Sequence, residues 1–275
     1  MNMYLILSLA LGLSCQYQGM AAPMTEEEVE KVKVLEKILP ELSNQPVYSR
    51  QESLYKQAIS KAEAVMEKIK NHPYNVELAK GTLPFKKFSY YLSQDIVFLT
   101  RTGQYMAVVA SRMPYKHRAA YLKTALDPEY HQTVFDGVEK MFKKFTDPKS
   151  KGEFVPDSRT TPALHSYVDF LSSAAYSEPI EVALAAFVSC PLVYNKLANH
   201  LKQVADPETP FYGWIKQFTS YGSGYVEEMS RIFDEMAGQA SDDVRSRMVE
   251  AFVKGVILEW RLWDDAYHGR SFFPE

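Results

Sequence analysis

The stretch that decides the fold of this protein reads Phe85-Lys86-Lys87-Phe88-Ser89-Tyr90-Tyr91-Leu92-Ser93-Gln94-Asp95-Ile96-Val97-Phe98-Leu99. Its apolar and aromatic side chains recur three and four residues apart, which places them with Asp95 on one face of a helix: Phe88, Tyr91, Leu92, Phe98 and Leu99. A carboxylate on such a face costs free energy unless it is paired or protonated. Asp95 is therefore either a structural acid bonded to a neighbouring element or part of a polar site inside the protein.

Helical periodicity of the same kind covers most of the chain on both sides of this stretch. Proline-containing joints separate the segments, at Asp127-Pro128, Asp147-Pro148, Glu178-Pro179 and Asp206-Pro207. No segment alternates with the period of two that is typical of a strand. We expect helices over residues 25–40, 46–70, 84–113, 114–125, 129–145, 161–176, 179–204, 210–236 and 241–267. The predicted fold class is an all-α bundle.

The composition limits the classes of protein to which the chain can belong. With 275 residues, 46% of them hydrophobic, it can bury a sizeable core as one large domain or two small ones. Because 31 basic residues are balanced by 34 acidic ones, wholesale binding of nucleic acid is not expected. The two cysteines, Cys15 and Cys190, cannot form a disulfide framework.

The N-terminus carries an apolar run from Tyr4 to Leu13, shorter than the roughly 20 residues that a membrane-spanning helix needs. Its length suits the apolar region of a signal peptide, and small residues follow it, although no Lys or Arg precedes it. Two interpretations stay open. Either residues 1–23 are a signal peptide of an exported protein, periplasmic or secreted, or translation starts at Met24 and the protein is cytoplasmic. Neither interpretation includes a stable membrane span.

Several familiar catalytic and binding motifs are missing from the sequence. It has no GxxxxGK[ST] loop, no GxSxG nucleophile elbow and no HExxH zinc motif. Two pairs at helical spacing, His165 with Asp169 and Asp264 with His268, could each be half of a metal site. Exposed polar pairs of this kind are far commoner than metal ligands. We therefore predict no metal and no cofactor.

A second acid, Glu259, repeats the pattern of Asp95 near the end of the chain. It lies on one helix face with an apolar and aromatic set: Val256, Leu262, Trp263, Ala266 and Tyr267. Acids on the apolar faces of two helices indicate a polar pocket inside the bundle.

Cys190 lies in an apolar helical segment and is followed directly by Pro191. Because proline has no N–H to donate, we expect a kink there, with Tyr194 one turn on and on the same face as Cys190. A lone cysteine in an apolar helix is most often inert packing. Beside a kink and two acids it could instead be a nucleophile, provided that its thiolate is favoured. Both interpretations stay open on the pattern alone.

These residues stand in an order that resembles the TenA family, the thiaminase II or aminopyrimidine aminohydrolase proteins. The resemblance runs through His72-Pro73-Tyr74, Gly81-Thr82-Leu83-Pro84, Tyr91-Leu92-x-Gln94-Asp95, Tyr167-Val168-Asp169-Phe170-Leu171, Cys190-x-x-x-Tyr194, Tyr212-Gly213-Trp214-Ile215 and Glu259-Trp260-Arg261-Leu262-Trp263-Asp264-Asp265-Ala266. It implies a haem-oxygenase-like helical bundle with a buried central pocket for an aminopyrimidine or thiamin. It also implies a homo-oligomer, a tetramer in the family, whose TenA-like domain spans residues 47–275 after a helical extension at 24–46.

The resemblance also implies roles for individual residues. Cys190 would be the nucleophile that adds to the pyrimidine ring, and Glu259 would shuttle the proton that the leaving group needs. Asp95 would hold the ring nitrogen and the amino group, and Tyr167 would stack on or orient the ring. Tyr194 completes the implied substrate-binding positions, together with three further residues: Phe98, Phe218 and Leu262.

The last three positions depart from the family. Phe98 and Phe218 stand where tyrosines are usual, and Leu262 replaces an aromatic residue. Because hydroxyl groups are lost, three functions stay open. The first is a TenA-type hydrolase of thiamin salvage. The second is a catalytically impaired protein that binds pyrimidines or thiamin, and the third is a PqqC-like or metal-dependent oxygenase on the same bundle.

Overall fold

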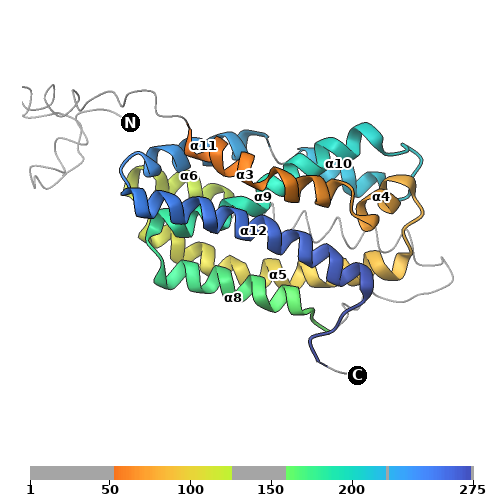
Figure 1. The fold of residues 1–275 in the computed structure, drawn as a ribbon. Helices are drawn as coiled ribbons and strands as arrows, with labels where there is room; N and C mark the ends of the chain where they lie inside the picture. The colour runs from red at the N-terminus through yellow and green to blue at the C-terminus, as the bar shows by residue number, and fades with distance from the viewer. Residues whose placement is uncertain (1–52, 126–158, 221–222, 274–275) are drawn as a thin grey trace, which may run out of the picture. The chain divides into compact units, whose positions relative to one another are not determined.

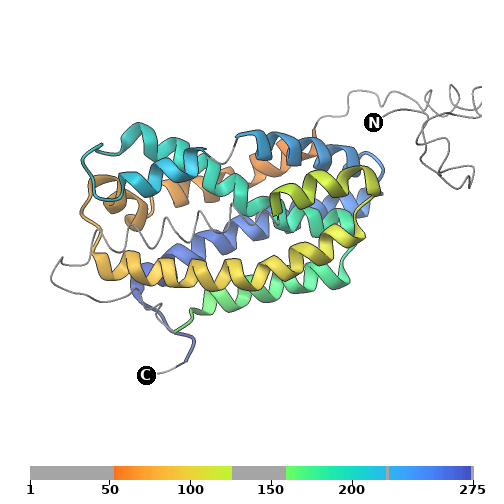
Figure 2. The ribbon, with the colours of Figure 1, turned by 180° about the vertical axis from the view of Figure 1, so that it is seen from behind.

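Two long helices, α9 (Ile180–Val204) and α12 (Asp242–His268), pack against each other more extensively than any other described pair. The structure, a computed structural model, describes residues 53–125, 159–220 and 223–273, where every regular element is a helix. Figures 1 and 2 show α5 (Phe85–Arg112) and α8 (Pro162–Ser177) side by side on one side of α12. On its other side lie α3 (Leu54–Lys70) and α11 (Ser223–Ala237). The predicted all-α class is confirmed.

Most of the expected helices agree with the structure to within one residue at each end. These are the helices expected over 84–113, 161–176, 179–204 and 241–267, together with α6 (Tyr115–Ala125). The C-terminal end of the helix expected over 46–70 also agrees, since α3 ends at Lys70. The helices expected over 25–40 and 129–145 lie outside the described residues, as do the segments 1–23 and 24–46.

One short helix, α4 (Pro73–Lys80), was not predicted from the sequence, and it follows the predicted break at His72-Pro73. Proline at the first helical position loses nothing, because the N–H there has no partner within the helix. The ring Nδ1 of His72 accepts a hydrogen bond from the backbone N–H of Tyr74 at 3.2 Å and so caps the helix. The helix ends at Gly81, whose φ of 72° lies in the left-handed region that favours glycine.

The single helix expected over 210–236 is wrong, because the structure has two helices there. These are α10 (Tyr212–Ser220) and α11, which begins at Ser223. Glycines stand at 222 and 224 of the sequence, and glycine lowers the stability of a helix interior by about 1 kcal/mol relative to alanine. The physical reason for the division is therefore present in the sequence.

The close packing of α9 on α12 depends on Gly255. A Cβ atom at this position would lie 2.0 Å from Ser189 Oγ and 2.8 Å from Ser189 Cβ, which is too close for any side chain. The absence of a side chain at 255 therefore lets the segment of α9 around Ser189 and Cys190 lie directly against α12. Pro191 lies inside α9, which continues as one helix to Val204.

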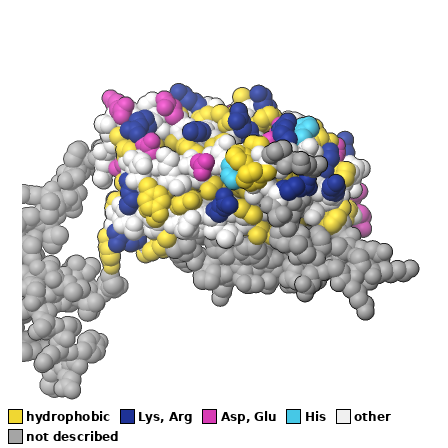
Figure 3. Space-filling model, turned by 90° about the horizontal axis from the view of Figure 1, so that it is seen from below, with side chains coloured by type: hydrophobic (Ala, Val, Ile, Leu, Met, Phe, Trp, Pro, Cys, Tyr) yellow, Lys and Arg dark blue, Asp and Glu magenta, His cyan; other side chains and the backbone are white. Residues whose placement is uncertain are grey.

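In the described part of the chain, α9 is the one helix long and apolar enough to span a membrane by length and composition. Most of its apolar stretch, 67%, is buried inside the bundle, as expected for the core helix of a folded domain. Figure 3 shows basic side chains at several separate places on one face of the molecule, interspersed with hydrophobic and acidic ones. The basic residues visible there do not gather into a single patch.

Candidate active site

Four helices each bring one polar residue toward the interior of the bundle. Asp95 comes from α5, Tyr167 from α8, Cys190 from α9 and Glu259 from α12. Asp95 is 7% exposed, Glu259 is 1% exposed and Tyr167 is fully buried. Because each residue lies on the inward face of its helix, residues far apart in sequence share one small region.

Glu259 is the centre of this cluster. Its Oε1 accepts a hydrogen bond from the hydroxyl of Tyr167 at 3.0 Å. Its Oε2 is sealed from solvent and has no hydrogen-bond partner. Cys190 lies close enough to this carboxylate for the two groups to change each other's pKa. A buried carboxylate with an unused oxygen can receive a proton or bind a donor group of a ligand.

Burial keeps both acids of the cluster protonated at pH values well above the range in which carboxyl groups usually ionise. It raises the pKa of Glu259 to about 8, although hydrogen bonds with Cys190 and Tyr167 oppose the shift. It raises the pKa of Asp95 to about 7. Among the described residues, no lysine, arginine or histidine pairs with either acid. Perturbed acids of this kind concentrate at functional sites, because the surroundings hold them near the pH at which they transfer protons.

The thiol of Cys190 is held in its neutral form. Burial first, and then the charge and hydrogen bond of Glu259, raise the pKa of Cys190 well above its usual range. A thiolate is therefore not present in advance, and the thiol needs a base to become nucleophilic. Glu259 is the acceptor in contact with it, so the geometry supports transfer of the thiol proton to that carboxylate.

Cys190 is only partly buried, although helices surround it. Cys190 and Tyr194 both keep an intermediate exposure, while their neighbours Ser189 and Val193 are buried. A separate groove of about 240 Å³ between α8 and α12 is lined by Phe170, Glu178, Arg247 and Lys254 among others, and it contains none of the predicted site residues. The enclosed pocket expected from the sequence remains a prediction.

Aromatic rings surround the polar cluster. The hydroxyl groups of Tyr91 and Tyr194 are hydrogen-bonded to each other. Trp263 stacks on Tyr91, with ring centroids 6.1 Å apart, and also packs on Tyr194 at 5.4 Å. Flat, rigid side chains of this kind suit a site for a planar heteroaromatic ligand.

Phe98 lies directly beside the cluster. Its ring packs on Tyr167 with a centroid distance of 4.8 Å, and its side chain is 5% exposed. Leu262 is buried on α12, one turn beyond Glu259. Phe218 belongs to α10, but its side chain lies outside the described residues. The structure thus brings Asp95, Tyr167, Cys190, Tyr194, Glu259 and Phe98 together, and their roles remain predictions.

Several residues of this region were not among the site residues predicted from the sequence. Ser189 adjoins Cys190, its Oγ donates to the carbonyl of Ala186 at 2.7 Å, and it affects the pKa of Tyr167. Tyr91 and Tyr74 pack on each other at 5.2 Å, and the charge of Asp95 affects the pKa of both hydroxyl groups. Tyr91 lies on the same helix face as Asp95, so the helical spacing already pointed to it. No pattern in the sequence points to Ser189, because its place beside the cluster results from the contact between α9 and α12.

In the structure, His165, Asp264 and His268 of the two histidine pairs contact other side chains. His165 Nε2 forms a hydrogen bond with Thr160 Oγ1 at 2.8 Å, and its ring stacks on Phe272. Asp264 forms an ion pair with Arg270, and its carboxylate lies 3.4 Å from a ring nitrogen of His72 and 3.3 Å from one of His268. Within the described ranges, no group of three or more His, Cys, Asp or Glu side chains is arranged to hold a metal ion.

A family model described as the TENA/THI-4/PQQC family matches residues 59–269. The aminopyrimidine aminohydrolase of Bacillus subtilis (strain 168) is 28% identical over 210 residues, which cover 71% of this chain and 82% of the relative. The aminopyrimidine aminohydrolase of Helicobacter pylori is 23% identical over 201 residues, covering 72% of this chain and 90% of the relative.

Solved structures give the same result for the fold. A TenA homologue from Pyrococcus furiosus has a TM-score of 0.67 at 19% identity, covering 78% of this chain and 99% of its own. A domain of unknown function with a heme oxygenase-like fold, from Shewanella denitrificans OS217, has a TM-score of 0.57 at 13% identity, covering 78% and 90%. The predicted haem-oxygenase-like bundle is confirmed.

Proposed function

The chain belongs to the TENA/THI-4/PQQC family, and on that premise we propose that it is a TenA-type hydrolase of thiamin salvage. Its substrate is an amino-substituted pyrimidine, either aminomethyl-pyrimidine or thiamin. The single observation that carries the proposal is that the thiol of Cys190 lies close enough to the buried carboxylate of Glu259 for each to change the pKa of the other. The relatives named aminopyrimidine aminohydrolase support the reaction class.

The reaction begins when the ionised form of Glu259, the minor form at neutral pH because its pKa is about 8, accepts the proton of Cys190. The resulting thiolate adds to the electron-poor pyrimidine ring and forms a carbon–sulfur bond. The bond between the exocyclic carbon and the leaving amine, or thiazole, then breaks, and the proton held by Glu259 is available to the leaving nitrogen. Water adds to the exocyclic carbon as the carbon–sulfur bond breaks and the thiol is restored. The net change is a hydrolysis, and no oxidant or reductant is consumed.

The other residues of the cluster bind and orient the ring. Asp95 accepts from the amino group, and in its protonated form it can also donate to a ring nitrogen. Its pKa, raised to about 7 by burial, keeps both forms accessible near neutral pH. Tyr167, held by Glu259, orients the ring, and Phe98 supplies an apolar contact where a hydroxyl would otherwise stand.

The decisive experiment compares wild type with Cys190→Ala, incubated with aminomethyl-pyrimidine and with thiamin. We expect wild type to release ammonia or the thiazole, and the variant to lose turnover while its far-ultraviolet circular dichroism stays unchanged. Val193→Ala, on the same helix, serves as a control for general disturbance of α9. Full turnover by Cys190→Ala would overturn the proposed mechanism.

A second candidate is a catalytically impaired protein that binds the same ligands. The observation that favours it is the strongly raised pKa of Cys190, in a site whose described residues include no cation to stabilise a thiolate. Such a protein would show a saturable thermal shift with aminomethyl-pyrimidine or thiamin, and no product by chromatography. Product formation that depends on Cys190 excludes this candidate.

A further inference from the structure

The first turn of α8 is held by a side chain from α5. Gln94 is fully buried, and both ends of its amide are bonded to backbone groups. Its Nε2 donates to the carbonyl of Arg159 at 2.9 Å, and its Oε1 accepts from the N–H of Thr161 at 3.0 Å. The neighbouring residue on α5 is Asp95, so the same turn of α5 faces both the start of α8 and the polar cluster.

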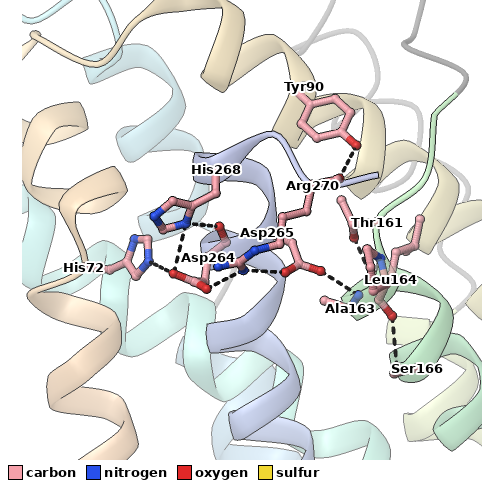
Figure 4. A network of polar contacts seen from close by, with 11 residues as sticks. His72, Tyr90, Thr161, Ala163, Leu164, Ser166, Asp264, Asp265, His268 and Arg270 are labelled. Carbon is pink, nitrogen blue, oxygen red and sulfur yellow. Dashed lines mark hydrogen bonds and ion pairs between the residues drawn. The ribbon is translucent and has the colours of Figure 1, made fainter. Parts of the chain in front are cut away.

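A second side chain holds the same turn from α12. Asp265 Oδ2 accepts from the backbone N–H of Ala163 at 2.7 Å (Figure 4). Asp265 Oδ1 accepts from Arg270 at 2.7 Å, which orients the carboxylate. A negative charge at this place also interacts favourably with the positive end of the α8 dipole.

The first backbone N–H groups of α8 have no partner within the helix, and more than one side chain accepts from them. Thr161 already caps the helix, since its Oγ1 accepts from the N–H of Leu164 at 3.0 Å. Gln94 and Asp265 therefore add a connection to two other helices. We call the two residues the α8 clamp.

The α8 clamp lies one helical turn from the polar cluster. Ala163 and Tyr167 are four residues apart and share a face of α8, which looks toward α12. Along that face, Asp265 bonds to Ala163, and Glu259 bonds to Tyr167 at 3.0 Å. The two contacts join the same pair of helices at successive levels, so a movement of the first turn of α8 changes the position of the Tyr167 hydroxyl.

We propose that Gln94 and Asp265 are positioning residues, which set the hydroxyl of Tyr167 against Glu259 and so tune proton transfer at that carboxylate. The inference rests on the proposed hydrolase function for its effect on turnover, but it concerns the geometry of the cluster. Hydrogen bonds from a fixed donor determine how readily a buried carboxylate accepts a proton, and a small misplacement is costly in an active site.

The test is a double-mutant cycle between the α8 clamp and Tyr167, measured as kcat/KM with aminomethyl-pyrimidine. Gln94→Ala is expected to lower kcat/KM by roughly 10- to 100-fold, mostly through kcat. In the Tyr167→Phe background the same substitution should have little further effect, because the group that it positions is already absent. Equal losses in both backgrounds would overturn the proposal.

Matched variants separate positioning from general destabilisation. Asp265→Asn keeps an oxygen that accepts from Ala163 and should retain most of the activity, whereas Asp265→Ala should behave like Gln94→Ala. Ser166→Ala removes an exposed hydroxyl from the same turn of α8 and should leave turnover unchanged. Should Asp265→Asn lose as much activity as Asp265→Ala, the bond to Ala163 is not what matters and the proposal fails.

A readout that needs no substrate distinguishes this proposal from the proposed function. The rate at which iodoacetamide alkylates Cys190, followed on its own peptide by mass spectrometry, depends on pH through the thiol and Glu259. Tyr167→Phe and Gln94→Ala should shift this pH profile in the same direction, and the double variant should shift it no further. Coincident shifts without any turnover support the clamp and contradict the hydrolase. Turnover with unrelated shifts supports the hydrolase and overturns the clamp.

Discussion

Two carboxylates on the same helix, Glu259 and Asp264, have opposite properties. Burial raises the pKa of Glu259 to about 8, and among the described residues no cation pairs with it. Burial also acts on Asp264, but hydrogen bonds with Arg270 and His72, and the charge of Arg270, lower its pKa below the usual value (Figure 4). One acid therefore holds a proton near neutral pH, while the other stays charged.

The difference comes from what the neighbouring helices present. Around Glu259 the bundle presents tyrosines, a thiol and a second acid, Asp95, whose charge raises the pKa further. Around Asp264 it presents a guanidinium and two imidazole rings, and the side chain is 18% exposed. A carboxylate paired with a cation stabilises the fold. A buried acid without such a partner lowers the free energy of unfolding, but its raised pKa suits it to proton transfer in a functional site.

The largest expected effect is a loss of activity on substitution of Glu259 but not of Asp264. Glu259→Gln removes the proton acceptor but keeps the shape and a hydrogen-bond acceptor for Tyr167, so kcat/KM should fall by about 10²- to 10⁴-fold. Asp264→Asn should retain most of the activity and lose stability instead. Steady-state kinetics with aminomethyl-pyrimidine, beside thermal unfolding, measures both. Similar losses of activity in the two variants would remove the functional distinction between the acids.

The pH dependence of stability should also differ between the two acids. Because the pKa of Glu259 is raised from 4.5 in the unfolded chain to about 8 in the folded protein, the folded state retains a proton that the unfolded state releases. The free energy of unfolding should therefore fall as the pH rises through this range. Glu259→Gln should flatten the dependence, as measured by denaturant unfolding at a series of pH values.

In the same experiment, the contribution of Asp264 to the free energy of unfolding should change with pH in the opposite direction. Its pKa is lowered in the folded protein, so its contribution to stability is present above the usual carboxyl range and lost as the pH falls. The difference between wild type and Asp264→Asn should be largest near neutral pH and disappear in acid. A difference that grows in acid would show that the ion pairs of Asp264 do not stabilise the fold.

A smaller effect is expected when the contact that brings α9 against α12 is disturbed. In Gly255→Ala the new methyl group meets Ser189, and because Cβ as well as Oγ is too close, rotation of the serine cannot relieve the clash. We expect a loss of about 1–3 kcal/mol of stability and lower activity, since the distance from Cys190 to Glu259 changes. The matched control is Gly103→Ala in α5, where nothing lies within 4 Å. That control should be stabilised by about 1 kcal/mol through helix propensity.

The smallest expected effect concerns Tyr74, whose buried hydroxyl has no hydrogen-bond partner. Removal of an unsatisfied buried group relieves its desolvation cost, so Tyr74→Phe should gain about 1 kcal/mol in the free energy of unfolding. Chemical denaturation measures this directly. Loss of stability in Tyr74→Phe would mean that the hydroxyl is satisfied in solution.

Local pattern was enough to predict most of the fold. The helix at 85–112 follows from its apolar spacing, and proline-containing joints correctly placed the ends of α8 and α9. Short-range signals failed where two effects compete. In α4, proline and histidine at the start form a cap rather than only a break. The apolar spacing over 210–236 indicates one helix, whereas α10 ends at Ser220 and α11 begins at Ser223.

The helical spacing in the sequence was enough to predict that Asp95 and Glu259 lie on apolar helix faces and that Cys190 and Tyr194 share another, because those relations repeat every turn of a helix. The resemblance to a family assigned roles to them. The packing of the helices, which the sequence pattern does not predict, brings the hydroxyl of Tyr167 to donate to Glu259 and places Cys190 close to the same carboxylate. The same packing pairs Asp264 with Arg270 and leaves Glu259 without a cationic partner among the described residues. Contacts between helices depend on which faces meet and how closely, and a pattern of period 3.6 carries no information about its partner.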